Sequence, residues 1–275
     1  MKEKVSVLMS IYFKEKPEYF RESLESIKNQ TYKINELVLV KDGTLTEELE
    51  EVIEEYKDVL NIKEVPLEKN VGLGLALREG ILHCSNEIIV RMDSDDISRK
   101  DRIEKQIKIL LENNEIGIVG SNSENFSKEI GDLKIFGVYP EKDKEIRKFM
   151  KRRCPFLHPT IMFKKSKAIE CGNYKDLLWF EDYDLFLRIL DYTKGYNIQE
   201  NLLYFRANEE MFKRRGGLIY IKREIEALTK FYKRGDMNFY YYITNLILRL
   251  GVRICGNKLR SLIYRKILRK GKINE

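Results

Sequence analysis

The chain has few of the residues that typically build zinc sites or disulfide frameworks. Its 275 residues include only two histidines, His83 and His158, which argues against a zinc site built on imidazoles. The four cysteines are scattered along the sequence and form no CxxC pair. Because no secretory signal accompanies them, we expect free thiols in a reducing cytosol.

Long hydrophobic runs are also missing. No segment reaches the roughly 18 uninterrupted apolar residues that a membrane-spanning helix needs. The N-terminal run VSVLMSIYF (5–13) is short and lacks a small-residue cleavage site, so we interpret it as a strand and not as a signal peptide. Yet 43% of the residues are hydrophobic and 11% are aromatic, which is typical of a globular chain with a sizeable core.

Charge is distributed unevenly. Residues 211–275 hold 17 Lys/Arg against 4 Asp/Glu, a balance of +13, so residues 1–210 carry −6 within the total of +7. A basic end of this strength indicates an anionic partner, either nucleic acid or a membrane leaflet. Residues 239–272 interleave aromatic, aliphatic and basic side chains, which suits helices lying in a membrane interface. A helix pair packed on the rest of the protein would give the same pattern. No nucleic-acid-binding motif accompanies the charge, so we expect no nucleic-acid partner.

Strand and helix patterns alternate over the first 121 residues. This alternation predicts an α/β fold with a mostly parallel central sheet and helices on both faces. Later segments predict a hairpin, further helices, a last strand and a C-terminal helical extension. The expected strands cover 5–12, 36–42, 61–67, 87–93, 116–121 and 201–208, the hairpin 125–141, and the helices 17–30, 46–59, 72–84, 99–114, 143–153 and 179–192.

Polar residues follow four of the expected strands. The carboxyl ends of parallel strands meet at one edge of a sheet, where ligands of such folds bind. We therefore expect these side chains to gather at one edge. They are Ser10 and Tyr12 after the first strand, Asp42 after the second, Asn70 after the third, and Asp93, Ser94 and Asp95 after the fourth.

The stretch VRMDSDDIS (90–98) has two interpretations. A solvated turn leading into a helix favours Asp and Ser, which are common in turns and at helix N-caps. The alternative is a cation site, because hard cations such as Mg²⁺ and Mn²⁺ prefer oxygen ligands and are held by one or two carboxylates plus substrate phosphates. The spacing of Asp93 and Asp95 lets one carboxylate reach the ion while the other contacts a sugar hydroxyl.

Other candidates also have a structural alternative. Asp42 either starts a turn before Gly43 or accepts hydrogen bonds from a base or a ribose. Glu181 and Asp182 stand at the head of an expected helix, where the helix dipole favours acids, but one of them could also act as a general base.

Two further positions are open in the same way. His158, in the apolar segment FLHPT, is either a buried, hydrogen-bonded histidine or a ligand. Arg206 is either a surface cation or a phosphate contact. The segment KRRGG (213–217) offers a solvated helix start or a phosphate contact, and the glycines of EKNVGLGLA (68–76) offer a helix start whose backbone could approach a nucleotide.

The chain resembles the family 2 glycosyltransferases of the GT-A fold. Within them it resembles the bacterial branch that builds capsule, exopolysaccharide and amylovoran-type chains. The resemblance covers about 1–217 and implies a nucleotide-sugar-binding half (1–121), an acceptor-side half (122–217) and a basic amphipathic tail (218–275). It is carried by eight segments in the family's order: VSVLMSIYFKE, LVLVKDG, LEKNVGLGLALREGI, IIVRMDSDDIS, CPFLHPTIMF, WFEDYDLFLR, LLYFRAN and MFKRRGG.

The resemblance implies a role for each matching residue. Asp95, together with Asp93, would bind the Mn²⁺ or Mg²⁺ that bridges the donor diphosphate, and Asp182 would be the catalytic base. The nucleotide-sugar would be bound by Ser10, Tyr12, Asp42, Asn70, Asp93, Ser94 and Arg206. The acceptor side and nearby positions would be formed by Glu181, His158, Trp179, Arg214 and Arg215.

The implied reaction is an inverting single displacement from a nucleotide-sugar, expected to be a UDP-sugar, to a growing glycan or a polyprenyl-linked acceptor. The expected location is the cytoplasmic face of the bacterial membrane, with the basic tail on anionic lipid. Two positions depart from the family. Met9–Tyr12 stands where relatives often have Pro-Thr-Tyr-Asn, and Asn208 replaces a histidine that can complete the metal shell, which leaves the third metal ligand open.

Two rival functions remain. A sugar nucleotidyltransferase of similar fold would need a glycine-rich loop with Arg or Lys after the first strand, and IYFKEKPE (11–18) lacks one. A non-catalytic membrane-surface module would not need the acids, so the presence of Asp93, Asp95 and Asp182 argues against it.

Overall fold

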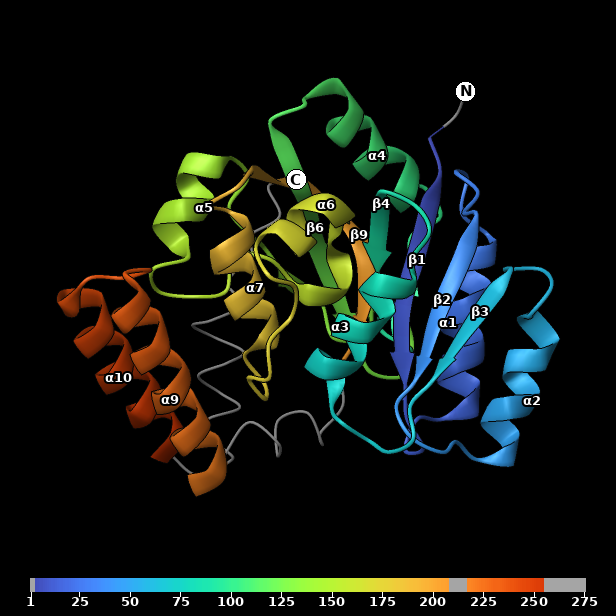
Figure 1. Cartoon of the computed structure of the whole chain (residues 1–275), viewed down its shortest axis with the longest axis horizontal. Coiled ribbons are helices and arrows are strands. Elements are labelled where there is room, and N and C mark those ends of the chain that lie inside the picture. Colours follow the sequence, from blue (N-terminus) through green and yellow to red (C-terminus); the bar gives the residue numbers. More distant parts are fainter. Residues whose placement is uncertain (1–2, 208–216, 255–275) are drawn as a thin grey trace.

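One mixed sheet runs through the part of the chain that this computed structural model describes, residues 3–207 and 217–254 (Figure 1). Within these residues its strand order is β3-β2-β1-β4-β8-β6-β9-β5, and β7 pairs with β6. The strands are β1 (Val5–Ile11), β2 (Glu36–Lys41), β3 (Ile62–Pro66), β4 (Ile88–Arg91), β5 (Ile97–Ser98), β6 (Ile116–Phe126), β7 (Ile135–Gly137), β8 (Met162–Lys164) and β9 (Lys194–Arg206).

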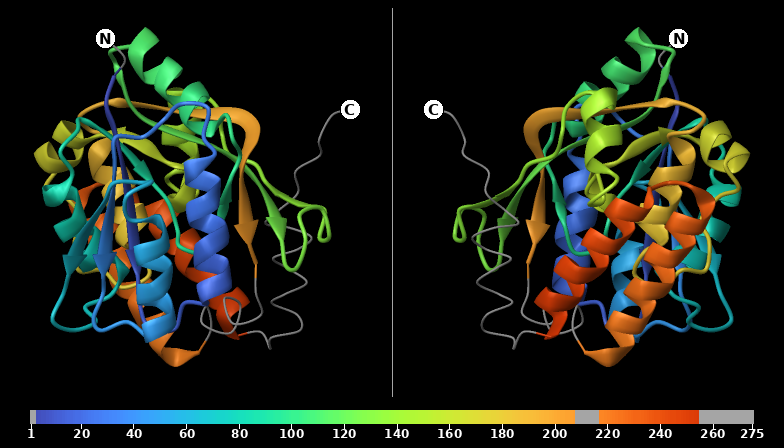
Figure 2. Two further views of the ribbon diagram at one scale, coloured as in Figure 1. Left: turned by 90° about the vertical axis from the view of Figure 1, so that its right-hand side faces the viewer. Right: turned by 90° about the vertical axis from the view of Figure 1, so that its left-hand side faces the viewer.

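Helices cover both faces of this sheet (Figure 2). Their starts follow simple rules where the sequence is clear, as at Pro17, which occupies the first turn of α1. The helices are α1 (Pro17–Lys28), α2 (Glu47–Tyr56), α3 (Leu73–His83), α4 (Arg102–Glu112), α5 (Asp143–Phe149), α6 (Lys165–Glu170), α7 (Glu181–Ile189), α9 (Leu218–Arg234) and α10 (Phe239–Ile254), with a short 3₁₀ turn, η1, at His158–Thr160.

The expected α/β class and the mostly parallel sheet are confirmed. β1 pairs in parallel with β2 and β4, and β2 pairs in parallel with β3. β8 lies between β4 and β6 and runs antiparallel to both, so β4 and β6 point the same way. β9 is parallel to β6. The three strands that run in the opposite direction, β5, β7 and β8, are two or three residues long.

The second half of the sheet differs in detail from the sequence expectation. The apolar stretch 154–163 ends in the antiparallel strand β8, and β9 begins at Lys194, seven residues before the expected start at 201. α4 begins at Arg102 instead of 99, because Ile97 and Ser98 pair with β9 as β5. The expected hairpin is confirmed as the antiparallel pair of β6 and β7.

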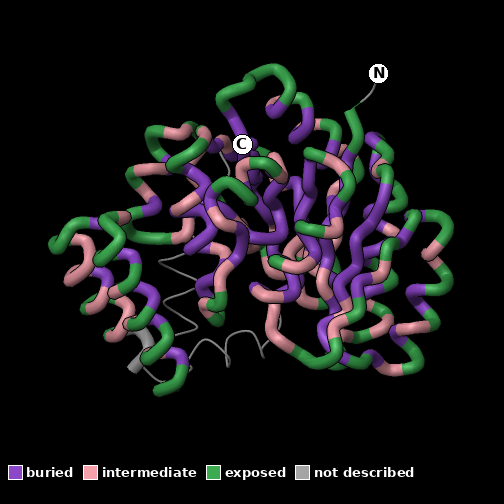
Figure 3. The backbone as a smooth tube through the Cα atoms, viewed as in Figure 1, coloured by how far each residue is buried: buried purple, intermediate pink, exposed green. Residues whose placement is uncertain are grey.

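Strands β1, β2 and β4 are buried on both sides because both faces of the sheet are covered there, whereas the edge strand β3 exposes Lys63 and Pro66. Val38 and Val40 of β2 point into the core under α3 and α7, whereas Leu37 and Leu39 point into the core under α1, α2 and α4. Figure 3 shows this as buried backbone through the centre of the sheet with exposed residues on the outer helices. The two cores fix the helices and thereby the strand ends that lead into the site.

The described part of the basic tail packs on the core that lies under α3 and α7. α9 and α10 lie beside α7 (Figure 1), and Tyr220, Leu228 and Phe231 of α9 share one buried cluster with Tyr183 and other α7 side chains. The fully buried Asp184 of α7 pairs with Arg188 of its own helix and, at 2.8 Å, with Arg234 of α9. This agrees with the packed-helix interpretation for 218–254, and residues 255–275 lie outside the described part.

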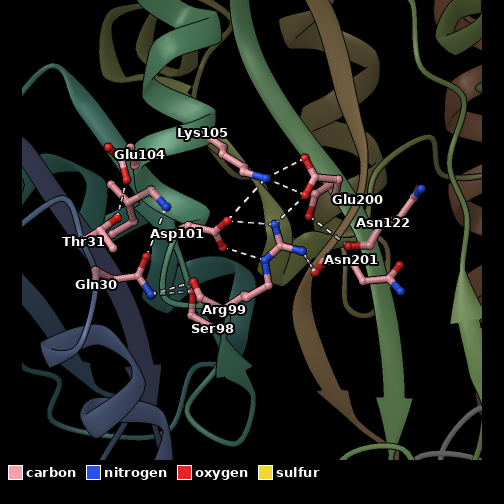
Figure 4. Close-up of polar contacts among 12 residues, drawn as sticks. Gln30, Thr31, Ser98, Arg99, Asp101, Glu104, Lys105, Asn122, Glu200 and Asn201 are labelled. Atoms are coloured by element: carbon pink, nitrogen blue, oxygen red, sulfur yellow. Dashed lines mark hydrogen bonds and ion pairs between the residues drawn. The ribbon is translucent and has the colours of Figure 1, made fainter.

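An ion-pair network joins α4 to β9 (Figure 4). Arg99 lies between Asp101, at 2.6 Å, and Glu200 of β9, also at 2.6 Å, and Lys105 contacts the same two carboxylates. These groups are partly exposed, so each pair contributes little by itself. Together they fasten β9 to the segment that directly follows the acidic stretch at 93–96.

Candidate active site

The loop after β2 is tied to the start of α3 through Asp42. Its carboxylate accepts hydrogen bonds from the backbone N–H groups of Val71, at 2.7 Å, and Gly72, at 3.1 Å. The Asn70 amide donates to the Asp42 carbonyl at 3.2 Å. Asp42 is 3% exposed, and the φ of Gly43 is +90°, as the turn interpretation expects. Its contact to a nucleotide base stays a prediction.

Ser10 and Tyr12 lie at the same edge of the sheet as Asp42. Ser10 pairs with Val40 across the β1–β2 ladder, and the Asp42 N–H donates to the carbonyl of Ile11 at 2.8 Å. Both Ser10 and Tyr12 are half-buried, so their polar groups are reachable from the loop side. The structure therefore brings the ends of β1 and β2 together with the loop that follows β3.

Three carboxylates gather after β4. One oxygen from each of Asp93, Asp95 and Asp96 lies within 4.8 Å of the others. Burial raises the pKa of Asp95 to about 7, and the charges of Asp93 and Glu15 add to this rise. Asp96 is fully buried, and burial together with Asp95 and Asp93 raises its pKa well above the ordinary value.

This cluster fits a hard divalent cation. Burial and neighbouring like charges disfavour the ionised form of a carboxylate. A cation that prefers oxygen ligands, such as Mg²⁺ or Mn²⁺, favours that form. One buried oxygen of Asp96 has no hydrogen-bond partner within residues 3–207 and 217–254, so the cluster retains an uncommitted acceptor. The sequence singled out Asp93 and Asp95 as metal ligands, and the structure adds Asp96 beside them.

Arg206 clamps the acidic turn from β9. Its Nε donates to the Asp95 carbonyl at 2.8 Å, and its backbone N–H donates to Asp96 at 2.8 Å. The guanidinium lies over the rings of Tyr19, at 3.9 Å, and Phe126, at 4.4 Å, and pairs with Glu22. It is only 4% exposed, so the surface-cation alternative is wrong, and the phosphate contact stays a prediction.

Two serine hydroxyls also form hydrogen bonds at the acidic turn. Ser94 donates its hydroxyl to Glu15 at 2.6 Å, which links the turn to the loop after β1. The Ser23 hydroxyl of α1 donates to the Asp93 carbonyl at 2.9 Å. The backbone of this turn is therefore held from α1, β1 and β9 at once, while the Asp95 side chain stays partly exposed.

The acid pair heads α7 as the sequence predicts. Asp182 is half-buried, accepts from the Tyr183 N–H at 2.6 Å and lies 3.9 Å from the Cys154 sulfur. Glu181 is 8% exposed, and burial followed by the Asp182 charge raises its pKa to about 8. Trp179 precedes the pair with φ of +70° and stacks on Tyr220 of α9 at 5.0 Å.

The first turn of α3 connects Asp42 to this acid pair. Asp42 holds the Val71 and Gly72 N–H groups, and two residues further on, a Cβ on Gly74 would lie 2.8 Å from the Cβ of Glu181. Glycine is therefore required at position 74 for the close approach of α3 and α7. The loop after β2 and the head of α7 meet across one helical turn.

Tyr174 and His158 form a buried, hydrogen-bonded pair on which charged groups of the site act. Burial raises the pKa of Tyr174, and the charges of Asp182 and Asp93 both add to this rise, so this ring is near acids of both groups. Its hydroxyl is 2.7 Å from His158 Nε2. Burial and then the Arg91 charge hold the pKa of His158 well below its usual value, which agrees with a buried, neutral, hydrogen-bonded histidine.

No sequence motif marks Arg91 as a member of the site. Arg91, the last residue of β4, pairs with Asp93, and its charge also lowers the pKa of Glu181 against the effect of burial. An arginine inside the apolar run EIIVRM (87–92) was the available signal. Arg214 and Arg215, together with Asn208, fall in residues 208–216, which lie outside the described part of the chain.

Comparisons with known proteins agree with this geometry. Residues 6–172 match the Glycosyl transferase family 2 domain. The chain is 38% identical over 268 residues, 97% of each chain, to the UDP-Gal:alpha-D-GlcNAc-diphosphoundecaprenol beta-1,3-galactosyltransferase of Escherichia coli. The chain belongs to glycosyltransferase family 2. It is also 35% identical over 262 residues to the amylovoran biosynthesis glycosyltransferase AmsE of Erwinia amylovora, with 95% of this chain and 98% of the relative covered.

A solved glycosyltransferase shows the same fold. The mannosyltransferase PcManGT from Pyrobaculum calidifontis, determined with GDP-Man and Mn²⁺, superposes with a TM-score of 0.64 over 99% of this chain and 77% of its own, at 14% identity. The GT-A fold expected for this glycosyltransferase is confirmed, and so is its resemblance to the amylovoran-type branch. The nucleotidyltransferase and non-catalytic alternatives have no support, since these close relatives are glycosyltransferases.

Replacing Glu181 with glutamine should flatten the pH dependence of stability. The folded protein holds the Glu181 proton with a pKa of about 8, raised from 4.5, so its stabilising contribution is complete below the ordinary value and is lost as pH rises through about 8. Between about pH 5 and pH 9 the Tm of the variant should fall less than the Tm of the wild type, by several degrees. A change of 1 kcal/mol in the free energy of unfolding shifts Tm by about 2–4 °C. Differential scanning calorimetry measures this.

The matched control is Glu112→Gln at the end of α4, where the side chain is 61% exposed. It should follow the wild-type curve. Equal pH slopes for the wild type and the Glu181 variant would contradict the protonated state of Glu181.

Proposed function

We propose that this glycosyltransferase moves a sugar from a UDP-sugar to a hydroxyl of a lipid-linked or polysaccharide glycan, in an inverting single displacement assisted by Mn²⁺ or Mg²⁺. One observation carries the proposal: Arg91 pairs with Asp93 of the carboxylate cluster after β4, and the charges of this cluster and of the acid pair at the head of α7 both act on the buried Tyr174. Donor and base would therefore work in one site.

The donor side of the proposal rests on the strand ends. Ser10, Tyr12 and Asp42 would hold the base, and Asp93 would contact the ribose. Asp95, with its neighbours in the cluster, would hold the cation. A bound cation supplies Lewis-acid stabilisation of the charge that develops on the leaving diphosphate. A UDP-sugar is supported by the 38% identical relative, whose name specifies UDP-Gal.

The acceptor side rests on the pair at the head of α7. A carboxyl with a pKa of about 8 is mainly protonated at neutral pH, so Glu181 is a poor proton acceptor there and Asp182 is the candidate base. In the proposed step Asp182 takes the proton of the acceptor hydroxyl while that oxygen forms a bond to the anomeric carbon. The bond from this carbon to the diphosphate breaks on the opposite face, and its electron pair leaves with the nucleoside diphosphate.

The acceptor class follows from the relatives. Their names specify an undecaprenol-diphosphate acceptor in one case and amylovoran biosynthesis in the other. UDP-galactose with an N-acetylglucosaminyl-diphosphoundecaprenol analogue is therefore the first pair to test. Activity with neither this pair nor other UDP-sugars would remove the proposal.

A lipid-linked acceptor also favours contact of the tail with membrane. No helix in the described part of the chain is long and apolar enough to span a bilayer. α10 nevertheless exposes two adjacent pairs, Phe239–Tyr240 and Ile247–Leu248, which lie eight residues apart and so fall on the same half of the helix. We propose that this face and the basic residues after it lie on the inner, anionic membrane surface, so that the enzyme is a peripheral cytoplasmic protein. The division into 1–217 and 218–275 also stays a prediction.

Asp95→Asn should abolish the Mn²⁺-dependent part of UDP binding, because the variant loses a charged oxygen ligand. Isothermal titration calorimetry with UDP, with and without Mn²⁺, measures it. Asp58→Asn, an exposed carboxylate after α2, is the control and should bind like the wild type. An unchanged Mn²⁺ effect in the Asp95 variant would remove the metal assignment.

Asp182→Asn should keep UDP binding and lose sugar transfer by at least about 100-fold, the scale of a general base. The measurement is kcat with saturating donor, followed by calorimetry on the same protein. Asp191→Asn, beyond the far end of α7, is the matched control. Turnover at the wild-type rate in the Asp182 variant would assign the base elsewhere.

Leu248→Asp should reduce co-sedimentation with vesicles that contain anionic phospholipid, because a carboxylate in the apolar face of α10 opposes insertion. Binding to vesicles of zwitterionic lipid alone should be weak for both proteins. Leu111→Asp on α4, 53% exposed, is the control and should sediment like the wild type. Equal sedimentation of both variants would locate any membrane contact away from α10.

A further inference from the structure

Arg91 is a charged side chain with almost no access to water. It is 1% exposed at the end of β4, and its Nη2 pairs with Asp93. Its Nε and Nη1 have no hydrogen-bond partner among residues 3–207 and 217–254. Buried arginines are usually fully paired, because an unmatched N–H of a charged group is costly to remove from water. Arg91 thus keeps two donors that the folded chain leaves uncommitted.

The surroundings of Arg91 belong to both parts of the site. Its charge acts on Asp93 and Asp96 after β4, and also on Glu181 at the head of α7. It acts as well on Tyr174 and His158, the buried ring pair. The charge of Arg91 therefore acts on the acids after β4 and on the acid at the head of α7.

A second buried arginine next to it shows what a purely structural one looks like. Arg102 of α4 is also fully buried, but all three of its nitrogens are used inside the protein. Its Nε donates to Gln106 at 3.0 Å, its Nη1 contacts the Met92 sulfur at 3.2 Å, and its Nη2 donates to the Arg91 carbonyl at 2.8 Å. Arg102 braces the backbone of β4, whereas the guanidinium of Arg91 faces the acids.

We infer that Arg91 is a positioning residue for glycosyl transfer. One arm of its guanidinium fixes the Asp93 carboxylate toward the donor, and its buried positive charge also acts on Asp96 and Glu181. The donor-side carboxylate is thereby held in the position that transfer requires. The inference rests on the proposed function and deepens it.

The fork shape of the guanidinium is what this role needs. Arginine presents its donors in a fixed plane and can serve two partners in different directions, whereas the lysine ammonium is a compact point charge on a flexible stem. Lysine at position 91 would keep the charge and lose the link. A displacement of about 1 Å between reacting groups costs about 100-fold in rate, so loss of this link should appear mainly in kcat.

The test compares Arg91→Lys with Arg102→Lys. These are the same change at two buried arginines, one at the end of β4 and one at the start of α4. Both full-length variants are measured for Tm, for Mn²⁺-dependent UDP affinity, and for kcat and KM of sugar transfer. We expect both to lose Tm. Arg91→Lys should also lose about 10- to 100-fold in kcat and bind UDP more weakly, while Arg102→Lys keeps the wild-type constants.

A second measurement separates positioning from folding. Arg91→Gly leaves a space for a free guanidinium ion, and millimolar guanidinium chloride should restore part of its kcat, with no such gain for Arg102→Gly. Equal kinetic constants for the two lysine variants, or no rescue of a folded Arg91→Gly protein, would overturn the inference. If the wild type transfers no sugar, the proposed function fails instead, and the UDP affinities of the two lysine variants still decide whether Arg91 serves Asp93.

Discussion

Burial of like charges at the end of β4 is the constraint on which the site depends. Asp93, Asp95 and Asp96 are crowded into one turn, and desolvation raises the pKa of the last two. Such a turn would relax into solvent if its backbone were free. Arg206 holds it from β9 and Arg91 from within the sheet, so the acids stay together. The second half of the sheet is therefore needed to keep the first half in its binding geometry.

The same physics separates the duties of the acids. The cluster after β4 is a set of carboxylates near one another, which suits a cation. The pair at the head of α7 has a buried member, Glu181, whose pKa burial raises to about 8, and a half-buried member, Asp182, which is the base of the proposed reaction. In the proposed function, environment more than residue type would distinguish the metal ligands from the base.

The sequence predicted the first half of the fold closely, because β1, β2 and β4 are buried on both faces and their sequences are mainly apolar runs. It predicted the second half less closely. β8 is three residues long and follows a proline-containing turn, and strands this short carry no period. The motifs predicted which residues gather at one edge of the sheet, but they did not predict the hydrogen-bond and ion-pair partners of these residues. The contact of Asp42 with the start of α3, and the effect of the Arg91 charge on Glu181, depend on which loops meet in space, and sequence spacing does not contain that information.

The packing of α9 against α7 has a consequence for protein engineering. Asp184, two residues after the acid pair, pairs with Arg234 of α9 as well as with Arg188 of its own helix, and the Phe231 ring packs against Tyr183. A chimera that exchanged the C-terminal helices between relatives would have to exchange the matching surface of α7 with them. Helices α9 and α10 are thus not a module that can be exchanged independently of α7.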